Sequence, residues 1–200
     1  MFVTFEGIDR SGKSTQAALL AKRLGDRALL VREPGSTPVG ERVREVLIDP
    51  AVAVDPTAEL LLFCAARAQL VAERIRPALE EGLTVICDRF TDSSVAYQGA
   101  GRGLGAERVQ RLCDEATGGL QPGLTILVDV DPEIAATRAG SGPDRFEGEG
   151  AALQERVAAA YRQLAATHPA RIVAVDGTAT TDQVAASVAA IIDQRAGGPA

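Results

Sequence analysis

The sequence predicts an α/β domain in which a parallel β-sheet has helices packed on both faces. Short apolar runs alternate with amphipathic stretches along the whole chain, which is typical of strands that alternate with helices. Residues 85–87 and 125–128 are continuously apolar, as central parallel strands buried on both faces should be. A glycine-rich loop joins the first apolar run to the first amphipathic stretch, as in the strand–loop–helix units of such folds.

Each element has its own local signal. The expected strands are short apolar runs at residues 2–6, 28–32, 83–87, 124–129 and 171–175. The expected helices are amphipathic or alanine-rich stretches at residues 14–24, 38–48, 56–81, 106–117, 132–139, 151–167 and 181–195. Pro38 and Pro132 suit the first turn of a helix, with Thr37 and Asp131 before them as N-caps. Pro77 lies inside the third helix and is expected to kink it or to end its first segment near residue 76.

Length and composition favour a single domain, residues 1–200, located in the cytoplasm. A net charge of −6 argues against a broad nucleic-acid or membrane surface, since both need clustered basic side chains. No apolar run approaches the ~20 residues of a membrane span, and the N-terminus lacks the pattern of a signal segment. Cys64, Cys87 and Cys113 are widely spaced and odd in number, so neither a zinc site nor a disulfide framework is expected.

The glycine-rich loop is a complete phosphate-binding motif. Residues 7–14, GIDRSGKS, fit G-x-x-x-x-G-K-[ST] at every fixed position, and Lys13 is one of only two lysines in the chain. Glycines let the backbone approach phosphate oxygens, the lysine neutralises their charge, and the Ser14 hydroxyl is a ligand for Mg²⁺. A plain glycine-rich turn is the alternative, but the strand before and the helix after the loop favour binding of a nucleoside triphosphate.

Other polar residues follow the expected strands, and ligands bind at the carboxyl ends of strands in an open parallel sheet. Residues 32–38 follow the second strand and serve equally well as a binding loop or as an ordinary turn. Asp88 ends a buried strand and is suited to holding Mg²⁺, whereas Arg89 is suited to binding a second phosphate; a strand-end ion pair is the alternative. Phe63 and Arg67 share a helix face that could stack on a base, although core packing is the commoner role at such spacing.

Two glycine-rich stretches are expected to be loops. Gly99, Gly101, Gly103 and Gly105 are interpreted as a loop that brackets Arg102. Residues 140–150, GSGPDRFEGEG, lie between two helices and form either a surface loop or a mobile lid over the phosphates. The lid is favoured, because kinases built on a phosphate loop need one.

Together these motifs resemble the thymidylate kinase (dTMP kinase) family over essentially the whole chain. The phosphate loop alone is shared by many NTPases, but the ordered set at these separations is far more specific. The residues that carry the resemblance are 5–16 (FEGIDRSGKSTQ), 32–35 (REPG), 61–63 (LLF), 67–69 (RAQ), 88–90 (DRF), 97–99 (YQG) and 144–147 (DRFE).

The resemblance implies a P-loop NTPase fold with three α/β/α layers, a five-stranded parallel sheet in the order 2-3-1-4-5 and a short mobile lid at about residues 140–150. It implies transfer of the γ-phosphoryl group of MgATP to dTMP, which yields dTDP and ADP. It also implies a homodimer, with the apolar helix around residues 60–64 contributing to the contact.

The resemblance further assigns roles to individual residues of this sequence. Phe63 is similar to the ring that stacks on thymine and Arg67 to the donor to its carbonyl, while Tyr97 is similar to the residue that crowds the 2′ position. Asp9 is similar to the carboxylate that meets the 3′-hydroxyl and Arg89 to the clamp on the dTMP phosphate. The expected dTMP site comprises Asp9, Glu33, Pro34, Phe63, Arg67, Arg89, Ser94, Tyr97 and Gln98.

The donor side is assigned in the same way. The expected ATP site comprises Gly7, Ile8, Asp9, Arg10, Ser11, Gly12, Lys13, Ser14, Thr15, Arg138 and Arg145, with residues 176–178 near the adenine. Ser14 and Asp88 are the expected Mg²⁺ ligands, and Asp9, Arg10, Lys13 and Arg89 the expected catalytic residues. Two positions depart from the family: Ser36 stands where a second glycine is common, and the lid has few basic residues, so Arg10 is expected to stabilise the transferring phosphoryl group.

The chemistry requires no general base. The acceptor phosphate has a second pKa near 6 and is largely dianionic at neutral pH, and the only histidine, His168, is far from every motif. The alternatives are a kinase for another nucleoside monophosphate and a nucleotide-gated regulatory NTPase. A guanine-reading switch would ordinarily carry an N-K-x-D motif, and this chain contains no asparagine.

Overall fold

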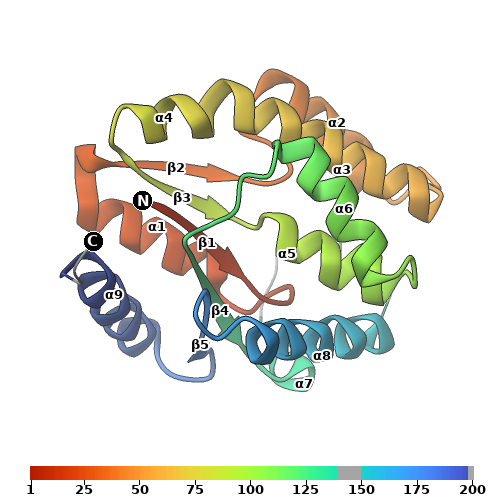
Figure 1. Cartoon of the computed structure of the whole chain (residues 1–200). Coiled ribbons are helices and arrows are strands. Elements are labelled where there is room, and N and C mark those ends of the chain that lie inside the picture. The colour runs from red at the N-terminus through yellow and green to blue at the C-terminus, as the bar shows by residue number, and fades with distance from the viewer. Residues whose placement is uncertain (139–149, 198–200) are drawn as a thin grey trace.

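The computed structural model describes residues 1–138 and 150–197 and contains one five-stranded parallel sheet (Figure 1). The strands are β1 (Phe2–Glu6), β2 (Ala28–Arg32), β3 (Thr84–Asp88), β4 (Leu124–Asp129) and β5 (Ile172–Asp176). Their order is β2-β3-β1-β4-β5, and every neighbouring pair is parallel, which confirms the expected topology. Strands β3 and β5 each lie one residue further along the chain than expected.

Helices connect successive strands. They are α1 (Lys13–Leu24), α2 (Pro38–Ile48), α3 (Pro56–Leu70), α4 (Arg76–Glu80), α5 (Thr91–Ser94), α6 (Ala106–Thr117), α7 (Pro132–Ala136), α8 (Ala151–Thr167) and α9 (Thr181–Gly197). A short 3₁₀ turn, η1 (Gly25–Arg27), precedes β2, and two π-helical segments, η2 (Val71–Ile75) and η3 (Val95–Gly101), extend α3 and α5. Thr37 and Asp131 are N-caps as expected, with side chains that accept hydrogen bonds from Gly40 N and Glu133 N.

The expected helix over residues 56–81 is one helical stretch with an irregular middle. The chain widens into the π turn η2 before Pro77, which then occupies the first turn of α4. Proline lacks the N–H that would continue the ladder, and a π turn before it removes the clash without breaking the helix. The irregularity therefore begins at Val71, earlier than the sequence predicts.

The prediction of a glycine-rich loop around Arg102 is wrong for the residues before Arg102. Gly99 and Gly101 lie within the helical segment η3, and only residues 102–105 remain a loop. A Cβ at Gly101 would come within 2.8 Å of Leu153 Cδ1 on α8, and one at Gly99 within 3.3 Å of Ala106 Cα. These glycines serve close packing between helices, a need that sequence composition cannot distinguish from a turn.

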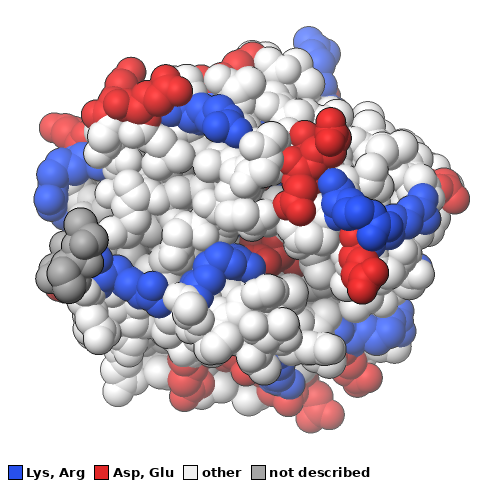
Figure 2. Space-filling view, in the orientation of Figure 1, with Lys and Arg blue, Asp and Glu red and all other residues white. Residues whose placement is uncertain are grey.

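The surface carries charges of both signs. Figure 2 shows acidic and basic side chains interspersed in small groups on one face, with no continuous basic area there. Among residues 1–138 and 150–197, no helix is long and apolar enough to span a bilayer.

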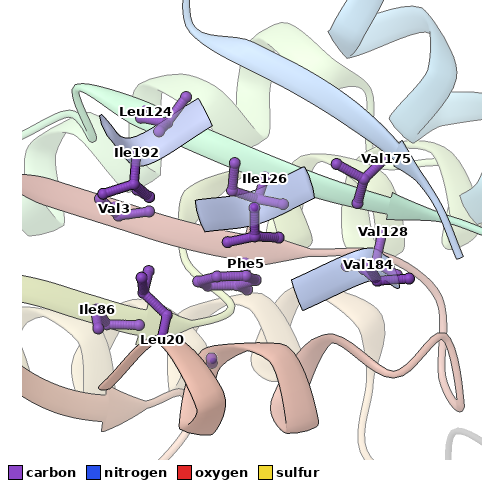
Figure 3. Packing of buried hydrophobic residues seen from close by; sticks show 12 residues of the cluster. Val3, Phe5, Leu20, Ile86, Leu124, Ile126, Val128, Val175, Val184 and Ile192 are labelled. Carbon is purple, nitrogen blue, oxygen red and sulfur yellow. The ribbon is translucent and has the colours of Figure 1, made fainter. Parts of the chain in front are cut away.

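The core has a layer on each side of the sheet. On one face, Val3, Phe5 and Ile126 pack against Leu20 of α1 and Ile192 of α9 (Figure 3). On the other face, α3, η2 and α4 cover β2 and β3, whereas η3, α7 and α8 cover β4. This confirms the three-layer α/β/α arrangement, and it leaves the carboxyl ends of the strands open along one edge.

Candidate functional site

Two cavities lie along the carboxyl edge of the sheet. The first, of about 350 Å³, is lined by Asp9, Lys13, Ser14, Arg32, Glu33, Pro34, Arg44, Ile48, Phe63, Arg67, Asp88, Arg89, Ser93, Ser94, Tyr97 and Gln98. The second, of about 500 Å³, is lined by Arg10, Ser11, Gly12, Lys13, Ser14, Thr15, Gln16, Val128, Arg138, Gly177, Ala179, Thr180, Thr181 and Val184. Lys13 and Ser14 line both, so the start of α1 separates two chambers that meet at the phosphate loop.

The phosphate loop is shaped by glycines that no other residue could replace without strain. Gly7 has φ 144°, and a Cβ there would lie 2.6 Å from Val128 O; Gly12, the residue before α1, has φ 99°. Lys13 is buried, and its Nζ donates to Ile8 O at 3.4 Å. An ammonium group and helix N-terminal amides thus converge on one point, an arrangement suited to a phosphate.

Burial has an electrostatic consequence for Lys13. Desolvation and repulsion by Arg89 lower the pKa of the Lys13 ammonium, against the attraction of Asp88, Asp9 and Glu6. A bound polyanion would reverse this balance, because it supplies the negative charge that the cavity lacks.

Two arginines flank the second cavity. Arg138 Nη1 donates to Arg10 O at 3.1 Å and to Ser11 O at 2.9 Å, while its Nη2 donates to Gly177 O at 2.5 Å. Arg10 Nη1 in turn donates to Arg138 O at 3.3 Å. Arg138 therefore braces the phosphate loop against the turn after β5, which is the segment expected near the adenine.

Not every expected donor-side residue lines this cavity. Ile8 is buried in the core, and its carbonyl accepts from Lys13 Nζ. The carbonyl of Gly7 accepts from Arg89 Nη1. Of residues 176–178, Gly177 alone lines the cavity. Arg145 and the lid, apart from Gly150, lie outside the described residues.

The first cavity contains a clamp built around Arg89 and Asp9. Arg89 Nη2 and Asp9 Oδ1 form an ion pair at 2.5 Å, and Tyr97 Oη donates to Asp9 Oδ2 at 2.9 Å. Gln154 Nε2 on α8 also donates to Asp9 Oδ2, at 3.0 Å. Burial raises the pKa of Asp9, but Arg89 and Lys13 outweigh that effect and hold the pKa below its ordinary value. Asp9 is consequently an anion that accepts hydrogen bonds.

The far end of the first cavity is organised by Arg67. Its guanidinium is buried, pairs with Glu33 Oε2 at 2.7 Å and donates to Phe90 O at 3.1 Å and Ser94 Oγ at 3.0 Å. Phe63 is half-buried: it packs against the core and also lines the cavity. A planar cation beside an aromatic ring is suited to a nucleobase that carries exocyclic oxygens.

Gln98 is held by a second buried ion pair. Its Nε2 donates to Glu59 Oε1 at 2.8 Å, and Glu59 also accepts from Arg102 Nε at 3.1 Å and Nη2 at 2.9 Å. Glu59 and Arg102 fix the amide of a cavity-lining side chain although neither lines the cavity itself.

Asp88 and Ser14 are suited to a divalent cation. Asp88 Oδ1 is buried and has no hydrogen-bond partner among the described residues, while the Ser14 side chain is exposed to both cavities. Among residues 1–138 and 150–197, which the structure describes, no group of three or more His, Cys, Asp or Glu side chains could hold a metal ion. Two oxygen ligands beside a phosphate site suit Mg²⁺, which keeps several waters and binds through phosphates.

All nine residues expected at the acceptor side line the first cavity, but several others there went unpredicted. Arg44 on α2 lines it and donates from Nη1 to Pro34 O at 3.2 Å. Its position on the helix after the 32–38 loop could have suggested this placement. Gln154 and Tyr161 reach the clamp from α8, and no local motif announces either one.

This sheet order, with a phosphate loop after β1 and a second cavity beside the nucleotide site, defines the class: a P-loop NTPase with room for an acceptor. The chain belongs to the thymidylate kinase family, whose model matches residues 5–188. The thymidylate kinase of Deinococcus radiodurans is 47% identical over 200 residues, covering 98% of this chain and 97% of the relative. That of Citrifermentans bemidjiense is 46% identical, covering 97% and 92%. A crystal structure of thymidylate kinase from Ehrlichia chaffeensis has a TM-score of 0.78 and 34% identity, covering 96% of this chain and 98% of that one.

Proposed function

We propose that this chain transfers the γ-phosphoryl group of ATP to dTMP and releases dTDP and ADP. The observation that carries the proposal is the sharing of Lys13 and Ser14 by the two cavities. ATP occupies the cavity beside Arg10 and Arg138, and dTMP the cavity beside Arg89, so the donor and acceptor phosphates meet at the start of α1. Residues 1–200 act as a single kinase domain, with residues 140–150 as its lid.

The acceptor cavity has features that favour thymine on deoxyribose. Arg67 can donate to a carbonyl of the base, Phe63 provides a face for stacking, and Ser94 and Gln98 complete the pocket. Tyr97 lines the cavity and its Oη donates to Asp9 Oδ2 at 2.9 Å, which supports the role proposed for its ring, crowding the 2′ position of the sugar.

Charge neutralisation is the main task of the site, because two anions must approach each other. Lys13 and Arg10 serve the transferring phosphoryl group, and Arg89 serves the acceptor phosphate. Mg²⁺, held through Ser14 and Asp88, would neutralise charge on the ATP phosphates. No side chain is needed as a base, since dTMP is already largely dianionic at neutral pH.

We further propose a homodimer that forms through α2 and α3. Leu61 on α3 is 51% exposed, and Val39 and Val46 on α2 are 45% and 41% exposed, which places three large apolar side chains on one pair of packed helices. Light scattering after size exclusion tests this: Leu61→Glu should yield monomers, whereas the matched change Ile134→Glu, at another exposed apolar residue, should not. A location in the cytoplasm is supported by Cys64, Cys87 and Cys113, which are all free and buried.

The decisive experiment is ADP formation from MgATP with dTMP, dUMP, dCMP, dAMP, dGMP and the thymine ribonucleotide compared side by side. A strong preference for dTMP that disappears in Arg89→Ala supports the proposal. Preference for another monophosphate would favour a kinase for a different acceptor. Release of inorganic phosphate from ATP at the same rate with every acceptor would contradict the assignment of the acceptor site.

A further inference from the structure

The Arg89 clamp rests on a buried carboxylate that does not reach the cavity. Glu6, the last residue of β1, is fully buried. Its Oε1 accepts from Phe90 N at 2.7 Å, and its Oε2 accepts from Ser93 Oγ at 2.6 Å and Tyr161 Oη at 2.8 Å. Glu6 therefore connects β1, the turn after β3 and helix α8 through one carboxylate.

The same two hydroxyls also meet Arg89. Its Nη1 donates to Ser93 Oγ at 3.2 Å and to Tyr161 Oη at 3.3 Å, and further to Gly7 O at 3.0 Å. Ser93 Oγ and Tyr161 Oη are themselves 2.8 Å apart. Each hydroxyl has a single proton, so the direction of every hydrogen bond in this cluster depends on where those protons point.

An ionised Glu6 sets that direction. A carboxylate can only accept hydrogen bonds, so the hydroxyl proton of Tyr161 points toward Glu6. The hydroxyl proton of Ser93 points either toward Glu6 or toward the Tyr161 oxygen. Only lone pairs then face Arg89, whose N–H groups can donate to both hydroxyls. If the Glu6 carboxylate is protonated or replaced by an amide, a hydroxyl proton of Ser93 or Tyr161 can turn toward Arg89. Two hydrogen-bond donors then face each other, and the hydrogen bond to Arg89 is lost.

We propose that Glu6 is a positioning residue for the acceptor-phosphate clamp, acting through the hydroxyls of Ser93 and Tyr161 to hold the Arg89 guanidinium in the cavity. The inference rests on the proposed function, in which Arg89 binds the phosphate of dTMP. It assigns Tyr161 of α8 to the same device, so α8 contributes to acceptor binding through both Tyr161 and Gln154, which holds Asp9.

The charges around Glu6 give this device a pH dependence. Burial and repulsion by Asp92 raise the pKa of Glu6 to about 7, against hydrogen bonds from Ser93 and Tyr161 and the attraction of Arg89. The other charged groups nearby are Lys13 on α1 and Arg171, which pairs with Asp92 at 2.6 Å. The clamp is thus held above pH about 7 and loosens below it.

The test compares the Michaelis constant for dTMP with that for ATP in the variants Tyr161→Phe and Glu6→Gln. Tyr161→Phe removes one hydroxyl and keeps a ring that packs in the core, so it remains informative if Glu6→Gln folds poorly. Both variants should raise KM for dTMP about 10-fold while KM for ATP stays near the wild-type value. Because both changes break the same chain of hydrogen bonds, the double variant should be little worse than either single one.

A matched control and a pH profile complete the test. Thr4→Val removes a buried hydroxyl two residues earlier in β1, one that meets Thr125 at 2.8 Å rather than Arg89, and should leave both Michaelis constants unchanged. Wild-type kcat/KM for dTMP should fall as pH drops through about 7, before the substrate phosphate titrates near 6, and Glu6→Gln should lose that first bend. Unchanged KM for dTMP in both variants, in an enzyme that does phosphorylate dTMP, would overturn this inference alone. Absence of dTMP phosphorylation in the wild type would instead overturn the proposed function.

Discussion

The buried Glu6 should lower the unfolding free energy above pH about 7, where its carboxylate is ionised and holds the Arg89 clamp. The variant Glu6→Gln measures the size of this loss. The pKa of this carboxyl is 4.5 in an unfolded chain and about 7 in the folded protein, because burial and Asp92 disfavour the anion. A raised pKa contributes stability that is fully present below pH 4.5 and is lost as the pH rises through about 7. At about 1.4 kcal/mol per pH unit, the loss between these limits amounts to roughly 3 kcal/mol of unfolding free energy.

The assay is urea unfolding of the wild type and of Glu6→Gln at a series of pH values. The amide introduced by this substitution does not titrate, so the unfolding free energy of the variant should rise relative to the wild type by about 2.5 kcal/mol between about pH 5 and pH 8. A constant offset from altered hydrogen bonds is allowed, since the prediction concerns the change with pH. Thr4→Val keeps Glu6 and should stay parallel to the wild type. Parallel curves for Glu6→Gln would show that Glu6 titrates normally and would refute the reasoning.

Three further outcomes are expected. Glu33→Gln leaves the buried Arg67 guanidinium without its counter-ion and should lower the unfolding free energy by about 3–5 kcal/mol, measured with urea; a loss below about 1 kcal/mol would contradict a buried ionic pair. Arg10→Ala should lower kcat by about 10³-fold or more with little change in the stability of the fold, if Arg10 stabilises the transferring phosphoryl group; near-full kcat would assign that role to other arginines. Gly101→Ala should lower the free energy of unfolding by about 1–3 kcal/mol, measured by thermal unfolding, because its Cβ would lie 2.8 Å from Leu153 Cδ1. An unchanged Tm would mean that Leu153 and α8 shift to accommodate the methyl group.

The sequence predicts the fold well because its signals are local and mutually consistent. Apolar runs, N-caps at Thr37 and Asp131 and a phosphate loop place the strands and helices within a few residues of their observed positions. Helix η3 was missed because its glycines serve packing against α8 and α6, and that need depends on which helices meet. Tertiary contact decided the conformation there, against the local composition.

The candidate site follows the same division. Residues in motifs are brought together because the carboxyl ends of β1, β2 and β3 are neighbours in the sheet, so short loops after them must share one cleft. Glu6, Gln154 and Tyr161 escaped prediction for a different reason. They act by hydrogen bonds to other protein side chains, and a partner on a distant helix leaves no spacing in the sequence to recognise.

Backbone strain in the described residues is concentrated in these same loops. The three non-glycine residues there with positive φ are Arg10 at 61°, Ser36 at 63° and Arg89 at 70°, which follow β1, β2 and β3 in turn. A left-handed conformation costs roughly 1–2 kcal/mol per residue, and glycine would avoid that cost. Glycine would also remove a guanidinium at two positions and, at the third, the hydroxyl that accepts from Arg32 N at 2.9 Å. The strain is therefore retained where a tight turn must also present a side chain, which is the requirement that a cleft between three strand ends imposes.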